Sequence, residues 1–395
     1  MDYILFEDEA RQSLLPLTHT RPVAEIRIGI LRIREKWEKY LTGNFSYLTE
    51  FFLKEKYPFK SGQQNIFINS SILPSQSLVK EIQNLKSGEK LIKEDVIIAA
   101  RMDDNLSGIE SIDQVEFNSS VNCITPFIKI NFSWDIFSKN ELALIDDFRL
   151  LTFEKKSISI SSTNTVISPE NIFLEEGAKV ECAILNGSGG YIYIGKNAEI
   201  MEGSMIRGPF ALCEHSQVKM GAKIYGATTI GPFCKVGGEI SNSVIFGFTN
   251  KAHDGFLGNS VLGEWCNLGA DSNNSNLKNN YSKIKVWNYM KETYINTGLQ
   301  FCGLIMGDHS KCSINTMFNT GTVVGVSANI FGNGFPPKFV PSFAWGGSEG
   351  FITYRLEDAL EVAQRVYERR QLDFNIVEKE ILRKLFDNTT KYRAW

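Results

Sequence analysis

The sequence predicts a protein of two parts, an α/β domain followed by a parallel β-helix with helices at its C-terminal end. Strand-like and helix-like segments alternate over residues 1–153. An apolar residue recurs at every sixth position through much of residues 166–340, and two amphipathic helical patterns lie within residues 341–395. Alternating strands and helices are typical of an α/β sheet, whereas a period of six is typical of a β-helix.

The six-residue repeat is clearest between Ile194 and Val236. At the usual apolar frequency of about one half, eight hits in one phase would occur by chance about once in 250. Helices and amphipathic strands have periods of 3.6 and 2, so neither explains the pattern. The aliphatic positions are Ile194, Ile200, Ile206, Leu212, Val218, Ile224, Ile230 and Val236, and four residues after them come Ala198, Ser204, Phe210, Ser216, Ala222, Thr228 and Cys234.

Two stretches interrupt this repeat. The period returns at Leu262 and Leu268, and again from Met306 to Ile330, but residues 240–256 and 277–300 do not keep it. Insertions in repeat folds form loops on one face, often the binding face. We therefore predict that both stretches are loops and that functional residues lie there.

The N-terminal residues predict a strand, a loop and a helix. Tyr3–Phe6 is a short apolar run, and the loop that follows contains Arg11 and Arg21 but no glycine. The loop would lie at the carboxyl end of the strand, where open α/β sheets bind ligands. A helix is predicted over residues 26–41 because apolar residues recur there at spacings of three and four: Ile26, Ile30, Ile33, Trp37 and Leu41.

Two further strands and one helix complete the predicted N-terminal domain. Asn65–Asn69 and Asp95–Ala100 are apolar runs of strand length, and Ser77–Leu85 has helical spacing. A polar connector at residues 154–165 precedes the β-helix. The C-terminal helices are predicted to cap the β-helix, because its last coil would otherwise leave an open sheet edge.

Composition sets limits on location and partners. The chain has 395 residues, 43% of them hydrophobic, and a net charge of −3, which gives no case for binding nucleic acid or an anionic membrane. No apolar run is long enough to span a bilayer, and no signal peptide is recognisable. Seven cysteines without a Cys-x-x-Cys pair indicate reduced thiols, and the predicted location is the cytoplasm.

His253 is the candidate catalytic residue. Of the four histidines, His215 and His309 lie in regular repeats, whereas His253 lies in the stretch that breaks the period. A histidine can act as a general base near neutral pH. A surface histidine without a catalytic role would fit the same position.

The residues from His253 to Ala270 read HDGFLGNSVLGEWCNLGA. This stretch resembles the acetyltransferase half of the GlmU family, whose members combine N-acetylglucosamine-1-phosphate uridyltransferase and glucosamine-1-phosphate acetyltransferase activities. That family has a loop histidine, an aromatic residue three positions later, Leu/Ile-Gly, and then Asn-Ile-Gly-Ala-Gly on a hexapeptide coil. The order of the two parts also resembles it, and the whole chain resembles the GlmU-like sugar nucleotidyltransferases of the Bacteroidetes type.

The resemblance implies a Rossmann-like nucleotidyltransferase domain at residues 1–153 and a left-handed, acyltransferase-like β-helix at residues 166–340. It also implies a homotrimer, in which grooves between neighbouring solenoids hold the pantetheine arm of acetyl-CoA. The implied substrates are a sugar phosphate, a nucleoside triphosphate and acetyl-CoA, as in UDP-N-acetylglucosamine synthesis.

The resemblance also assigns roles in the acyl-transfer site. His253 corresponds to the general base, and Glu239 to a carboxylate that holds the acceptor. Asn267 and Asn276 correspond to two asparagines that line the same site, and the backbone of Ala270 corresponds to an acetyl-CoA contact. Where the family has a phosphate-binding lysine two residues after the glutamate, this chain has Ser241, and Lys251 or Lys278 is expected to supply that charge.

For the N-terminal domain, the resemblance places a nucleotide at the loop after the first strand. That loop lacks the family's glycines, so Arg11 and Arg21 are expected to contact the phosphates. The family's metal-binding aspartate appears as Asn69. Since an amide binds Mg²⁺ more weakly than a carboxylate, Asp103 and Asp104 are the alternative Mg²⁺ ligands.

Three functions are compatible with these patterns. The first is an enzyme that transfers acetyl to an amino-sugar phosphate at His253 and a nucleotidyl group to a sugar 1-phosphate. The second is a thymidylyl- or uridylyltransferase whose β-helix only oligomerises. The third is a non-catalytic protein that binds a nucleotide sugar, which the Gly-poor loop and Asn69 favour.

Overall fold

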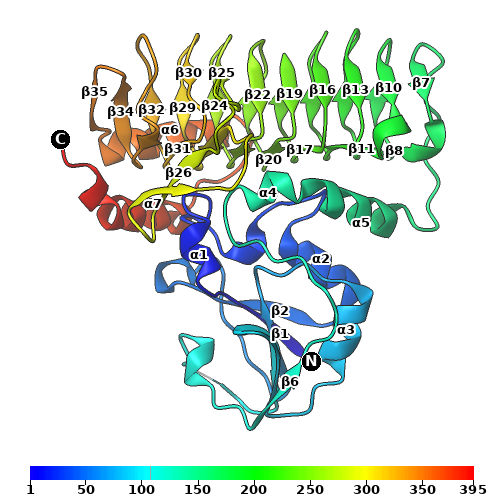
Figure 1. Ribbon diagram of the computed structural model, residues 1–395, viewed down its shortest axis with the longest axis vertical. Coiled ribbons are helices and arrows are strands. Elements are labelled where there is room, and N and C mark those ends of the chain that lie inside the picture. Colours follow the sequence, from blue (N-terminus) through cyan, green and yellow to red (C-terminus); the bar gives the residue numbers. More distant parts are fainter. Residues whose placement is uncertain (107) are drawn as a thin grey trace.

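The computed structural model describes residues 1–106 and 108–395, and it shows an α/β domain lying against the side of a long solenoid (Figure 1). Both parts match the predicted fold class, an α/β nucleotidyltransferase-like domain and a left-handed parallel β-helix with C-terminal helices. Within the described residues, no helix is both long and apolar enough to cross a membrane.

Three parallel sheets form the three sides of the solenoid, which we call the first, second and third face in the order in which a coil passes through them. The first face contains β7 (Thr165–Ile167), β10 (Ile184–Asn186), β13 (Met205–Arg207), β16 (Lys223–Tyr225), β19 (Glu239–Ser241) and β22 (Phe256–Gly258), and the pair β25 (Asn273–Asn274) and β30 (Met317–Phe318) continues it. The second face contains β8 (Ile172–Leu174), β11 (Ile192–Ile194), β14 (Phe210–Leu212), β17 (Thr228–Ile230), β20 (Val244–Ile245), β23 (Val261–Leu262), β28 (Leu304–Met306), β31 (Thr322–Val324) and β33 (Phe339–Val340). The third face contains β9 (Lys179–Val180), β12 (Glu199–Ile200), β15 (Gln217–Val218), β18 (Lys235–Val236), β21 (Asn250–Lys251), β24 (Asn267–Leu268), β29 (Lys311–Cys312), β32 (Asn329–Ile330), β34 (Ala344–Gly347) and β35 (Gly350–Thr353).

The six-residue repeat sets the interior of this solenoid. Every aliphatic and small position predicted between Ile194 and Cys234 is at most 1% exposed. Ile194 and Leu212, for example, are register partners on neighbouring coils of the second face. Each coil therefore buries its apolar residues against the next, as the repeat predicts.

The predicted loop at residues 240–256 is wrong, because the coil continues through it without an insertion. The strands β19, β20, β21 and β22 occupy all three faces in turn. Ile240, Ile245 and Leu257 point into the solenoid core. The corners here are shorter, so interior positions follow Val236 after four and then five residues, and the repeat changes phase.

Residues 277–300 do leave the solenoid. They carry a hairpin of β26 (Lys285–Asn288) and β27 (Thr293–Asn296), which packs over β31 at the second face. The ring of Trp287 stacks on Phe339 at 4.3 Å, and Tyr289 meets His19 of the N-terminal loop at 5.4 Å between ring centroids. The insertion thus helps to join the two parts of the chain.

The N-terminal sheet has six strands in the order β2-β1-β3-β5-β4-β6. The strands are β1 (Asp2–Phe6), β2 (Asn44–Leu48), β3 (Asn65–Asn69), β4 (Glu89–Lys93), β5 (Val96–Met102) and β6 (Ser119–Asn122). β1 runs parallel to β2 and β3, whereas β5 runs antiparallel to β3. The helices of this domain are α1 (Ala10–Ser13), α2 (Ile33–Tyr40), α3 (Gln76–Gln83), α4 (Asp135–Ser138) and α5 (Asn140–Thr152), with short 3₁₀ turns at Val23–Glu25, Phe51–Leu53 and Ile112–Gln114.

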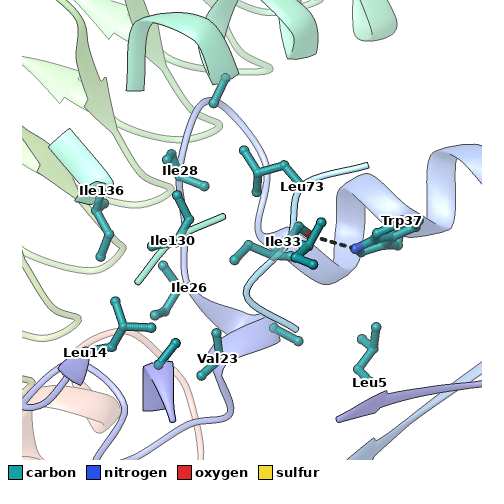
Figure 2. Packing of buried hydrophobic residues seen from close by; sticks show 14 of the residues in the cluster. Leu5, Leu14, Val23, Ile26, Ile28, Ile33, Trp37, Leu73, Ile130 and Ile136 are labelled. Atoms are coloured by element: carbon teal, nitrogen blue, oxygen red, sulfur yellow. Dashed lines mark hydrogen bonds between the residues drawn. The ribbon is translucent and has the colours of Figure 1, made fainter. Parts of the chain in front are cut away.

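The helix predicted over residues 26–41 begins only at Ile33, and Figure 2 shows Ile26 and Ile28 on an extended segment before it. A tight turn at Gly29 (φ +70°) interrupts the pattern. A side chain at Gly29 would come within 2.7 Å of the carbonyl oxygen of Ala143. Asp147 accepts hydrogen bonds from the amides of Ile30 and Leu31 at 2.7 and 2.9 Å, which fixes the turn against α5.

The α/β domain meets the second face of the solenoid through α4 and α5, which lie along it in Figure 1. Phe148 on α5 stacks on Tyr191 at 4.2 Å and meets Phe173 edge-on at 6.5 Å. Asn140 donates to the carbonyl of Ala227 at 2.9 Å. The interface is therefore packed and hydrogen-bonded.

The C-terminal helices α6 (Leu356–Glu368) and α7 (Ile376–Asn388) do not cap the solenoid end as predicted. They pack along its side, in a core shared with Trp265, Val326 and Phe343. β35 instead covers the last strand edge of the third face by pairing antiparallel with β34. The remaining short turns are Pro169–Asn171, Gly187–Gly189 and Thr390–Tyr392.

Candidate functional site

A groove of about 610 Å³ crosses the third face of the solenoid, with His253 at one end and the end of α6 at the other. It brings together three of the predicted site residues, His253, Asn267 and Ala270. The remaining lining residues are Lys235, Phe248, Asn250, Ala252, Trp265, Cys266, Leu268, Gly269, Lys311, Ile314, Val366, Arg369 and Arg370. We call this the third-face groove.

His253 lies at the corner between β21 and β22, and its side chain is exposed. The corner is held from inside by Lys251, which is only 2% exposed. The Lys251 ammonium donates to the carbonyl oxygens of His253 and Asp254 at 2.6 and 3.2 Å. Burial lowers the pKa of Lys251 to about 8, while Asp254 and Asp271 oppose the shift.

The role of Lys251 as a substrate contact stays a prediction that its buried position does not favour. Its side chain occupies an interior position of the solenoid, in register with Val236 on the preceding coil. Both of its hydrogen bonds go to the backbone of the corner that carries His253. Lys251 thus positions that corner and does not offer its charge to a ligand at the surface.

The floor of the groove is polar. Asn250, Asn267 and Lys311 are register neighbours on successive coils of the third face. The side-chain oxygen of Asn250 is buried without a hydrogen-bond partner among the described residues. A buried acceptor of this kind is costly unless a ligand or water donates to it.

Glu239 lies around the corner from the groove, on the first face. Its amide donates to the carbonyl of Gly255 at 3.2 Å, two residues after His253. Its carboxylate accepts a hydrogen bond of 2.6 Å from the hydroxyl of Tyr225. His253 therefore stands between the third-face groove and Glu239.

Asn276 is not part of this arrangement. It bonds Asn259 at 2.8 Å, at the opposite end of the first face from His253. The six residue steps from His253 to Asn259 cover roughly 20 Å of chain at about 3.3 Å each. Within one chain, Asn267 and Asn276 therefore do not line a common site.

The predicted nucleotide loop is largely taken up by contacts within the protein. The guanidinium of Arg11 is buried and bonds Glu7 at 2.9 Å and the carbonyl of Thr18 at 2.8 Å. Arg11 and Glu7 are among the residues that line a pocket of about 340 Å³ at the carboxyl end of β1. Arg11 chiefly holds the loop together. The pocket beside it lies at the carboxyl end of β1, where a ligand was predicted to bind.

Arg21 lies in the interface between the two parts and is not among the residues that line the pocket beside Arg11, so the structure does not bring the two arginines to one nucleotide site. The guanidinium of Arg21 forms ion pairs with Glu264 at 3.0 Å and with Asp308, and it is 5% exposed. Both carboxylates belong to corners of the solenoid. Arg21 and Arg32 hold the pKa of Glu264 at about 2, against the effect of burial.

Asn69 and the two predicted aspartates do not form a metal site. The Asn69 amide donates to Asp8 at 2.9 Å, and its oxygen accepts from Ser71. Asp103 and Asp104 follow β5, which runs antiparallel to β3, so they lie at the opposite edge of the sheet from Asn69. Asp103 is paired with Arg101 at 3.0 Å.

The side chains of Asn69, Asp103 and Asp104 thus do not form the predicted Mg²⁺ site. Throughout residues 1–106 and 108–395, no group of three or more His, Cys, Asp or Glu side chains is arranged to hold a metal ion. As alternative ligands to Asn69, Asp103 and Asp104 were expected near it, but the antiparallel direction of β5 brings them to the other end of β3. Strand direction could not be deduced from the apolar run of β5 alone.

Several residues of the groove were not predicted. Lys235 and Lys311 come one position before interior residues of the repeat, Val236 and Cys312, so the repeat itself places them on the outside of the third face. Arg369 and Arg370 follow α6, and no sequence pattern connects them with His253. Their place in the groove depends on how α6 docks.

Comparison with known proteins supports the two-part organisation. Residues 3–156 match the family model described as "Sugar nucleotidyl transferase". The "Bifunctional protein GlmU" of Synechococcus elongatus is 23% identical over 264 residues, which are 61% of this chain and 54% of that protein. The GlmU protein of Methanocaldococcus jannaschii is 32% identical over 87 residues, 22% of this chain and 21% of that protein.

The chain thus spans about half the length of the first curated relative it matches. Among solved structures, the polySia-specific acetyltransferase NeuO is 14% identical, covers 53% of this chain and 99% of its own, and has a TM-score of 0.26. That score is too low to support an argument about function. The sequence matches confirm the predicted resemblance to GlmU-like transferases, and the activity of the whole chain remains a proposal.

Proposed function

We propose that this chain is a transferase of sugar-nucleotide synthesis that moves an acetyl group from acetyl-CoA to the amine of an amino-sugar phosphate. The observation that carries the proposal is the third-face groove, which ends at His253 and which, among the described residues, is lined by cations but by no carboxylate. An anionic thioester donor suits such a groove, and an exposed imidazole at its end suits base catalysis.

In the proposed reaction, the acceptor amine lies next to His253. The imidazole takes a proton from the amine nitrogen as the lone pair of that nitrogen attacks the thioester carbonyl. The new carbon–nitrogen bond forms, the carbon–sulfur bond breaks, and coenzyme A leaves as a thiol once its sulfur is protonated. The carbonyl bonds from Lys251 keep the His253 corner in one position, which favours a productive geometry.

The donor and the acceptor are proposed to approach His253 from different faces. The pantetheine arm carries amide N–H groups, and the unpartnered oxygen of Asn250 and the exposed Asn267 lie on its proposed path. Ala270 lines the same end of the groove and would contact the donor near the thioester. Glu239, on the first face, would hold the acceptor sugar.

A second activity is proposed for the N-terminal domain, since its residues match the sugar nucleotidyl transferase family model. Nucleotidyl transfer to a sugar 1-phosphate, of the UDP-N-acetylglucosamine type, would take place in the pocket beside Arg11 and Glu7. Arg11 would contact the substrate as one of the residues that line this pocket. No step of this proposal depends on Mg²⁺ at the predicted residues.

A homotrimer in the cytoplasm is part of the proposal. Exposed apolar side chains on the first face, Ile167, Ile184, Met205 and Tyr225, support self-association through that face. All seven cysteines are free, which suits a reducing compartment. Sedimentation of the purified chain would test the trimer.

Release of free coenzyme A from acetyl-CoA with amino-sugar phosphates as acceptors tests the acyl-transfer proposal. We expect turnover by the wild type and a loss of at least about a hundredfold in kcat for His253→Ala, the range in which general bases contribute. His215→Ala is the matched control, because His215 is an exposed histidine of the same solenoid outside the groove.

Three results would change the proposal. Full activity of His253→Ala would remove the base assignment. Pyrophosphate release from a nucleoside triphosphate and a sugar 1-phosphate, without any coenzyme A release, would favour a nucleotidyltransferase whose solenoid only oligomerises. Inertness in both assays, with thermal stabilisation by a nucleotide sugar, would favour a binding protein.

A further inference from the structure

The third-face groove holds four cations, Arg369 and Arg370 next to α6 and Lys235 and Lys311 in the row of floor residues that contains Asn250 and Asn267. No Asp or Glu lines the groove, and none of the four forms an ion pair within the described part of the chain. The polar bonds formed by Arg370 and Lys311 go to carbonyl oxygens, those of Phe233 at 3.1 Å and His309 at 2.9 Å. Their charges are therefore not neutralised.

The two arginines act electrostatically on Lys235. Burial lowers the pKa of Lys235, and the charges of Lys219, Arg370 and Arg369 lower it further. Burial also lowers the pKa of Lys311 to about 8. A group of like charges without counter-ions is unfavourable in the free protein, and a bound anion would relieve it.

α6 is fixed over the groove by an aromatic stack. Tyr367 packs on Trp265 at 4.1 Å, and Trp265 packs on Phe248 at 4.2 Å. The two arginines follow directly after α6, so this stack sets their position at the edge of the third face. Arginines at a helix C-terminus also interact favourably with the helix dipole. That interaction would explain Arg369 and Arg370 but not the presence of Lys235 in the same groove.

The groove has the length of one side of a coil. Phe248 and His253 line its two ends, and the five residue steps between them span about 17 Å at roughly 3.3 Å each. An elongated ligand could thus place an anionic group near α6 and a reactive group near His253. The floor between these ends is formed by the same chain.

We propose that Arg369, Arg370 and Lys235 form the docking site for the phosphate groups of an acyl-CoA whose thioester lies at His253. This inference rests on the proposed acyl transfer and extends it, because it assigns the wall of the donor site to α6 of the same chain. The groove expected between neighbouring solenoids stays a prediction, and the residues assigned here line a groove of one chain.

The test compares acetyl-CoA with acetylpantetheine, which carries the same thioester but none of the phosphates. In the double variant Arg369→Gln/Lys235→Gln, we expect the KM for acetyl-CoA to rise about tenfold or more with kcat preserved, the effect of losing one or two charge-assisted contacts. The KM for acetylpantetheine should not change. Arg355→Gln is the matched control, since Arg355 precedes α6 and its side chain is 80% exposed.

Calorimetric binding of coenzyme A gives a readout that does not need turnover. Coenzyme A should bind His253→Ala as tightly as the wild type and bind the double variant about tenfold more weakly. This pattern would support the docking site even if no acyl transfer were found. An unchanged affinity in the double variant, an equal effect on both donors, or no binding of coenzyme A to the wild type would overturn it.

Discussion

Replacing Lys251 with methionine tests whether the His253 corner is held by a buried charge. Lys251 is the one charged side chain among the solenoid residues at most 2% exposed within the described chain, and its two hydrogen bonds go to the carbonyls of His253 and Asp254. Methionine has a similar length and carries no charge. The substitution therefore removes the ammonium and both bonds but leaves the interior filled.

The magnitude follows from the pKa of Lys251, which burial lowers from 10.5 to about 8. Because the folded pKa is the lower one, the unfolded chain binds more protons between these two values, and the free energy of unfolding rises with pH across that window. The full shift is worth about 3 kcal/mol, at 1.36 kcal/mol for each pKa unit. Between pH 7 and pH 10, the wild type should recover roughly 2.5 kcal/mol of it.

Urea denaturation of the wild type and Lys251→Met at both pH values measures this difference. The wild type should gain about 2.5 kcal/mol relative to the variant on going from pH 7 to pH 10. Other groups that titrate in this range, including Lys311, cancel in the comparison. A difference that does not depend on pH would refute the assignment of a buried charge, and Lys179→Met, at an exposed position of the same face, should show no such dependence.

Two further substitutions test the contacts that hold the parts together. Asp308→Asn removes one of the two carboxylates that pair with the buried guanidinium of Arg21, so we expect a loss of about 3 kcal/mol or more in unfolding free energy, seen as a lower thermal midpoint. An unchanged midpoint would contradict the burial of this network. Trp265→Ala removes the stack with Phe248 and Tyr367 and should cost about 3–5 kcal/mol, with faster proteolysis near α6. Unaltered proteolysis would show that α6 is held in another way.

The regular part of the fold could be predicted because each coil obeys the same local rule. An aliphatic residue such as Ile224 faces the same interior in every repeat, and a small residue such as Ala222 fits where the chain bends. The short corners after Val236 changed the phase without changing the fold. A period counted along the sequence treats such a change as an interruption, so residues 240–256 were assigned to a loop.

The remaining errors come from contacts between residues far apart in sequence. The turn at Gly29 is stabilised by Asp147 on α5, and apolar spacing alone favoured a helix through it. The antiparallel direction of β5, which removes Asp103 from the ligand edge, is set by pairing with β3 and β4. The groove at His253 could be predicted only in part, because its basic wall is brought there by α6.

The coil at residues 264–267 explains how these distant contacts bear on one site. At this corner Glu264 pairs with Arg21 of the α/β domain, and Trp265 stacks on α6. The next residue, Cys266, is buried in the solenoid core, and Asn267 lies on the floor of the groove. These four consecutive residues contact the α/β domain, α6, the solenoid core and the groove. A displacement of the domain interface must therefore move the groove floor or break the ion pair between Arg21 and Glu264. The position of α6 over the proposed donor site is therefore tied to the docking of the α/β domain, although none of the described residues of that domain lines the groove.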